Sequence, residues 1–185
     1  MALRFSRWAG IFLALGLASC SASKVSQCNS FAEVINDAQA FKNEFESDID
    51  SFTQQASGAQ SLEDIQGAAS QYIGAVDTVV TNIDGMVTSL NELELPDEEL
   101  ATYRDEYVTI ITGSGEELAV ASEAMELVAG AESETDLGNV LEEFQQKANS
   151  AFTNLQALST QEATLVTSIN GYCGAETPAA GEAAE

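Results

Sequence analysis

The sequence predicts an all-α protein, specifically an antiparallel up-down-up-down four-helix bundle closed by a disulfide. Four long segments repeat apolar residues at alternating intervals of three and four, which is the spacing of one helix face, whereas a strand would repeat every two residues. Short connections separate these segments, which favours antiparallel neighbours. Two cysteines, Cys28 and Cys173, stand at opposite ends of the helical region.

Residues 1–19 have the composition of a secretory signal peptide and are set aside from the fold. Arg4 and Arg7 precede a short apolar run that ends in small residues. This run has about a dozen residues, whereas a helix needs about 20 to cross the bilayer core. We therefore expect an export signal, and an uncleaved membrane anchor is the less favoured alternative.

The end of that segment, Leu17-Ala18-Ser19-Cys20, resembles the lipobox of bacterial lipoproteins at all four positions. The resemblance implies cleavage before Cys20, which then carries the lipid as the first residue of the mature chain. It also implies an extracytoplasmic protein on the periplasmic face of a bacterial membrane. Ser21 follows the cysteine, which favours the outer membrane in the best-known sorting rule; the thylakoid lumen is the alternative.

The first expected helix carries an apolar stripe from Phe31 to Phe52 and ends at the turn-rich residues 56–59. The second has an uninterrupted stripe from Leu62 to Leu90. Before it, Ser61 with Asp64 three residues on resembles a capping box, with Asp in place of the usual Glu or Gln.

The third expected helix begins at Pro96, which suits a first turn, and stops at Gly130. At its centre we expect residues 113–115, Gly-Ser-Gly, to pack closely against a bulky neighbour such as Phe41 or Phe45; a kink or a ligand pocket is the alternative. The fourth helix runs from about residue 135 to residue 172, and only Glu162 interrupts its apolar stripe.

The cysteines agree with this topology. If Cys20 is lipidated, Cys28 and Cys173 remain as an even pair in an oxidising compartment, where disulfides form. In an up-down-up-down bundle the start of the first helix and the end of the fourth lie at the same end. We therefore expect a Cys28–Cys173 disulfide. The expected domains are a lipidated tether over residues 20–27, a bundle over 28–173 and a disordered acidic tail over 174–185.

Charge excludes one large class of partner. Without residues 1–19 the chain holds 30 acidic residues and four basic ones, a net charge of −26. Nucleic-acid binding needs clustered Lys and Arg, so no nucleic acid is expected. We interpret the charge mainly as a source of solubility, and a site for a basic partner or for cations is the alternative.

Two polar residues interrupt the apolar stripes, Arg104 in the third helix and Glu162 in the fourth. Our hypothesis is a partly buried Arg104–Glu162 ion pair that helps to fix the register of the helices. The alternative is that both side chains extend outward into solvent.

Catalytic and metal chemistry are disfavoured. Histidine is absent, which removes Ser-His and Cys-His nucleophiles and most zinc sites, so neither an enzyme nor a cofactor is expected. Lys42 and Lys147 are expected on the surface, Lys147 beside Glu143. A weak resemblance to a calcium loop lacks the required glycine, so a cluster of acids at a helix start is preferred for Glu132, Glu134, Asp136 and Glu143.

The overall plan is similar to that of small helical lipoproteins of cyanobacteria, including the lumenal PsbQ-like subunit of photosystem II and uncharacterised members of that group. The resemblance covers the lipobox and the architecture, and it implies no particular binding residue. We expect a non-catalytic interaction or scaffolding lipoprotein with an unknown protein partner. The alternative is a ligand-binding module that takes a divalent cation at the acidic loops or a small apolar molecule in the bundle.

Overall fold

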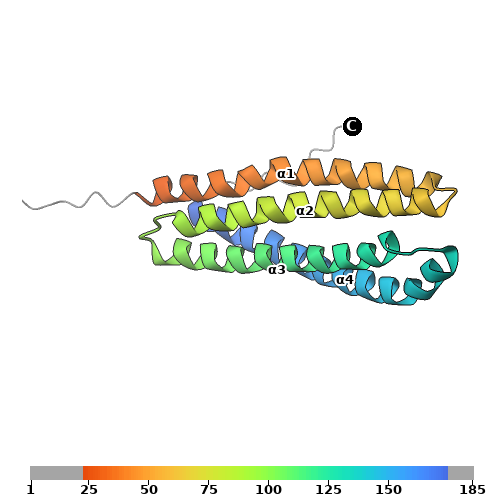
Figure 1. The fold of residues 1–185 in the computed structure, drawn as a ribbon. Coiled ribbons are helices and arrows are strands. Elements are labelled where there is room, and N and C mark those ends of the chain that lie inside the picture. Colours follow the sequence, from red (N-terminus) through yellow and green to blue (C-terminus); the bar gives the residue numbers. More distant parts are fainter. Residues whose placement is uncertain (1–22, 175–185) are drawn as a thin grey trace, which may run out of the picture.

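The computed structural model describes residues 23–174, apart from the side chains of residues 38–40, and this part of the chain is all helical (Figure 1). The expected signal peptide, the lipidated Cys20 and nearly all of the expected tail lie outside the described residues. None of the helices in the described part is long and apolar enough to cross a membrane. The helices are α1 (Lys24–Gly58), α2 (Leu62–Glu92), α3 (Glu98–Ala129) and α4 (Glu134–Cys173).

The helices follow one another back and forth along one long axis, as the expected up-down-up-down order requires (Figure 1). Packing is extensive between α1 and α2, between α2 and α3, and between α3 and α4, but sparse between α1 and α4. The α4 helix crosses α3 obliquely, and its beginning lies on the side of α3 away from α1 (Figure 1). The bundle is therefore open along the seam between α1 and α4.

Each helix begins at a side chain that accepts a backbone hydrogen bond. The capping box at α2 is confirmed, because Ser61 Oγ accepts from the N–H of Asp64 and the Asp64 carboxylate accepts from the N–H of Ser61. Two expected boundaries need correction. Ser23 caps α1, so the last four residues of the expected tether over residues 20–27 are helical. Asp97 caps α3, which places Pro96 before that helix.

The largest buried side chains gather near the end of the bundle where α1 begins and α4 ends. Phe31, Leu90 and Leu100 are fully buried in one cluster with Cys28. Burying each such side chain contributes about 1.5–3 kcal/mol. Towards the opposite end, buried positions are mostly small: Ala68, Ala69, Ala75, Ala124, Ala131 and Ala151.

The glycines of the third helix do not pack against Phe41 or Phe45, which were the expected neighbours, but face Leu158 and Ile83. A Cβ on Gly113 would lie 3.4 Å from Leu158 of α4, and one on Gly115 would lie 3.6 Å from Ile83 of α2. These are ordinary van der Waals distances, so an alanine would fit at either position and the helix packing does not require glycine there.

The Cys28–Cys173 disulfide is confirmed, with 5.9 Å between the two Cα atoms. It joins the fifth residue of α1 to the last residue of α4, and so ties together two helices that make few contacts with each other. The disulfide therefore holds α1 and α4 together at this end, whereas side-chain packing along the seam between them contributes little.

Replacing both cysteines by serine should lower the free energy of unfolding by about 4–5 kcal/mol in the chain-entropy description. The reason is that the bridge closes a loop over a sequence separation of 145 residues, which strongly restricts the unfolded chain. Urea unfolding followed by circular dichroism measures the change, and reduced wild-type protein is the control. A loss below about 1 kcal/mol would contradict the importance given to this link.

Candidate functional site

A cavity of about 270 Å³ lies between all four helices. Its position along α1 is about 20 Å from Cys28, since 13 residues separate Cys28 from Phe41 and each adds about 1.5 Å. The lining is mainly apolar, with Phe41 and Phe45 from α1, and Val79, Ile83, Met86, Ile111, Leu118 and Leu155 from the other helices.

The polar part of the cavity is a set of three side chains, Lys42, Tyr107 and Glu162, which we call the polar triad. The Tyr107 hydroxyl donates to Glu162 Oε1 at 3.1 Å, and the Lys42 ammonium donates to Glu162 Oε2 at 3.5 Å. The Glu162 side chain is 25% exposed and that of Lys42 is 51% exposed. The triad therefore lies where the partly open cavity meets solvent on the open side of the bundle.

Tyr107 is the buried member of the polar triad, 1% exposed, and its ring meets that of Phe31 edge-on with 6.4 Å between centroids. Burial raises the pKa of its hydroxyl far above the ordinary value, and the negative charge of Glu162 raises it further. Tyr107 is therefore a neutral hydrogen-bond donor, and its bond holds the Glu162 carboxylate in a fixed position.

The expected Arg104–Glu162 ion pair is wrong. The Arg104 guanidinium lies 2.8 Å from the carboxylate of Asp105 and also donates to the backbone carbonyl of Leu93, in the connection before α3. Its charge and hydrogen bonds are therefore used by these two residues. Sequence reasoning identified Glu162 as the polar exception but missed Lys42 and Tyr107. The position of Tyr107 on an apolar stripe could have indicated a polar partner nearby, because a buried phenol needs a hydrogen-bond acceptor.

A second polar cluster surrounds the disulfide end. The Tyr172 hydroxyl donates to the Asp97 carboxylate at 2.9 and 3.0 Å, and the Lys24 ammonium lies 3.3 Å from the centre of the Tyr172 ring. The N–H of Asp97 donates to Gln27 Oε1 at 2.9 Å. These contacts tie the start of α1, the cap of α3 and the end of α4 together, which indicates a structural role.

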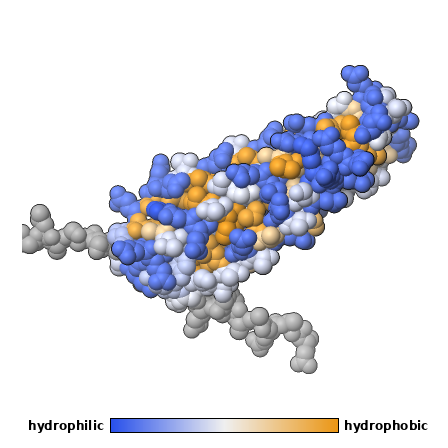
Figure 2. All heavy atoms as spheres, turned by 90° about the horizontal axis from the view of Figure 1, so that it is seen from below, coloured by the Kyte–Doolittle hydropathy of each residue, from blue (hydrophilic) through white to orange (hydrophobic). Residues whose placement is uncertain are grey.

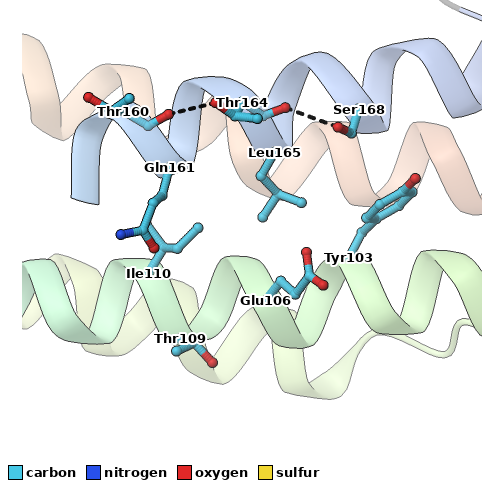
Figure 3. Close-up of a pocket in the computed structure, with 9 residues that line it drawn as sticks. All are labelled: Tyr103, Glu106, Thr109, Ile110, Thr160, Gln161, Thr164, Leu165 and Ser168. Atoms are coloured by element: carbon cyan, nitrogen blue, oxygen red, sulfur yellow. Dashed lines mark hydrogen bonds between the residues drawn. The ribbon is translucent and has the colours of Figure 1, made fainter. Parts of the chain in front are cut away.

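A shallow groove of about 460 Å³ between α3 and α4 is the other candidate (Figure 3). Figure 2 views the molecule from the side where α3 and α4 lie in Figure 1, and hydrophobic side chains gather near the middle of this face. In the groove, Thr160, Thr164 and Ser168 donate their hydroxyl hydrogens to backbone carbonyls of α4, two of these bonds being drawn in Figure 3. Because these donors are already used, the groove offers fewer specific contacts than the cavity.

The remaining candidates occupy helix surfaces. Ser133 caps α4 and its hydroxyl donates to Asp136 at 2.7 Å, so Glu134 and Asp136 lie in the first turn of a helix, as preferred. Among the described residues no group of three or more His, Cys, Asp or Glu side chains could hold a metal ion. Lys147 donates to Glu123 of α3 at 3.0 Å, and this bond together with the charges of Glu123 and the expected neighbour Glu143 raises the pKa of Lys147.

The comparisons with known proteins give one match. A family model described as uncharacterised lipoprotein PM1805 matches residues 28–170. No curated protein and no solved structure matches the chain. The matched range covers nearly all of the helical region, including the whole polar triad, and begins at the first cysteine of the disulfide.

The cluster at the disulfide end generates a pH prediction. Hydrogen bonds from the N–H of Leu100 and from the Tyr172 hydroxyl lower the pKa of Asp97 below its ordinary 3.8. As the pH falls, the unfolded chain therefore takes up this proton first, and the stabilisation is lost as the pH falls through the folded-state pKa. Between pH 6 and pH 3 the wild type should lose more stability than Asp97→Asn.

Urea midpoints at the two pH values measure this difference. Asn also caps helices well, so the variant keeps the start of α3. Asp84→Asn, at an exposed position of α2, is the control and should follow the wild type. Equal acid losses in the wild type and Asp97→Asn would refute the assignment.

Proposed function

The chain belongs to the uncharacterised lipoprotein PM1805 family, and on that basis we propose that it is a membrane-anchored, extracytoplasmic, non-catalytic interaction or scaffolding lipoprotein. Cys20 is the proposed lipid attachment site, because residues 17–20 match the lipobox pattern. The outer membrane is the proposed destination, on the basis of Ser21, with the thylakoid lumen as the alternative. The lack of histidine in the sequence supports a non-catalytic role.

An exposed apolar face on α4 carries the interaction proposal. Leu141 and Phe152 are 40% and 61% exposed. They are 11 residues apart, which is close to three full helical turns, so they lie on the same face about 16 Å apart. Single exposed apolar residues are ordinary on protein surfaces, but two large ones aligned on one helix face suit insertion into a partner's groove.

The charge around this face indicates the chemistry of the partner. Without residues 1–19 the net charge of the chain is −26, and Glu142 is exposed about a quarter turn from Leu141. A partner with an apolar groove and a basic rim would complement this arrangement, and the net charge of the chain would speed its association. The proposed partner is therefore a protein with a basic surface around an apolar groove.

A second candidate function is the binding of a small apolar molecule, and the cavity between the four helices supports it. Ligand sites in helical bundles occur between facing helices, where an apolar lining surrounds a few placed polar groups. The polar triad supplies such groups, and its partly exposed members, Lys42 and Glu162, lie at the boundary between cavity and solvent.

A photoreactive amino acid at position 152 should capture the partner in intact membranes. We expect a specific adduct several-fold stronger than that from position 150 of the same helix, which lies more than half a turn away and is also exposed. Immunoblotting and mass spectrometry of the adducts measure this. Equal labelling from both positions, or no adduct above background, would contradict an interaction through this face.

Cys20→Ser should abolish incorporation of an alkyne-labelled fatty acid and release the protein from washed membranes, or block its maturation. Cys28→Ser is the matched control, since it removes a neighbouring cysteine and should keep the label. Gel fluorescence after coupling a dye to the alkyne measures incorporation. Label retained in Cys20→Ser would overturn the proposed anchor.

A further inference from the structure

We propose that the cavity between the four helices binds a single-chain organic cation, with its ammonium head on the Glu162 carboxylate and its apolar tail between Phe41, Phe45 and Leu155. This inference deepens the second candidate function and rests on it. The argument has three steps, concerning the tail, the head and the charge of the chain.

The cavity is suited to a slender apolar tail. Its volume of about 270 Å³ lies just below the range of ~300–1,000 Å³ that is typical of small-molecule sites. Aromatic and aliphatic side chains from all four helices line it, and Ser114 and Ser159 are its small polar members. An unbranched chain of several methylene groups therefore fits better than a bulky ring system.

The Glu162 carboxylate is placed to receive an ammonium group. The Tyr107 hydroxyl holds one oxygen, and the Lys42 ammonium lies at a long 3.5 Å from the other. Lys42 is half exposed, and an exposed ion pair of this kind contributes little to stability, so its side chain can leave at low cost. The Lys42 ammonium thus occupies the position that the ligand's ammonium would take.

The charge of the chain selects a cation. Without residues 1–19 the net charge is −26, which concentrates cations near the surface and repels anions. A ligand carboxylate would also meet the negative charge of Glu162 directly. Because α1 and α4 make few contacts with each other, a ligand has access through the seam that Lys42 and Glu162 flank.

The test uses the full-length protein in isolated membranes and three photoreactive probes with the same ten-carbon tail. The heads are an ammonium, a hydroxyl and a carboxylate. We expect saturable labelling by the ammonium probe, with adducts on cavity residues of α1 and α4. Competition by unlabelled decylamine, decanol and decanoate should follow the order ammonium, alcohol, carboxylate.

Glu162→Gln should weaken ammonium labelling by about tenfold, because a charge-assisted hydrogen bond becomes a neutral one, and should change alcohol labelling less than about twofold. Glu123→Gln is the matched control, since Glu123 also pairs with a lysine, Lys147 at 3.0 Å, outside the cavity. It should leave all labelling unchanged. Ser159→Phe should fill the cavity and reduce labelling by every probe, and retained alcohol labelling in Glu162→Gln shows that the fold is intact.

The outcomes separate the two ideas. If the alcohol and the ammonium label the cavity equally and Glu162→Gln has no effect, the cation inference fails while the second candidate function stands. Carboxylate labelling as strong as ammonium labelling also overturns the cation inference. If no probe labels the cavity saturably, both fail.

Discussion

The disulfide between the fifth residue of α1 and the last residue of α4 is the constraint on which the rest of the structure depends. The disulfide holds these helices together although they hardly touch along their length. Around it, the Tyr172 hydroxyl donates to Asp97, the cap of α3, and the Lys24 ammonium lies over the Tyr172 ring. Polar contacts therefore reinforce the covalent link. The buried side chains Phe31, Leu90 and Leu100 gather at this end too. Stability is therefore concentrated where the bundle is closed.

The seam between α1 and α4 is open along the rest of the bundle, away from the disulfide. Beyond the disulfide end, α1 and α4 make few contacts, the partly exposed Lys42–Glu162 pair among them. There α4 lies obliquely across α3, and a cavity remains between the helices. Towards the far end the buried positions are mainly alanines, which bury less apolar area than the side chains near the disulfide. Local opening should cost less free energy there, and opening along the seam exposes the cavity.

The helices, their caps and the disulfide were predictable because their signals are local or topological. Apolar periodicity marks helix faces, Ser61 with Asp64 marks a start, and two cysteines at the ends of an even number of antiparallel helices must meet. The polar triad was not predictable in the same way. Lys42 and Glu162 are 120 residues apart, and their meeting depends on the rotation of each helix about its own axis. Arg104 found closer partners, its neighbour Asp105 among them, so the pairing expected from helix height alone was wrong.

The carboxylate of Glu162 is the feature of the cavity that packing least requires. Buried Tyr107 needs a hydrogen-bond acceptor, and the amide oxygen of a glutamine would supply one without a charge. The ion pair with Lys42 is half exposed and long, so it stabilises the fold little. An apolar side chain facing the cavity would add hydrophobic contact in its place. The negative charge of Glu162 is thus explained better by the binding of a cationic ligand than by the stability of the bundle.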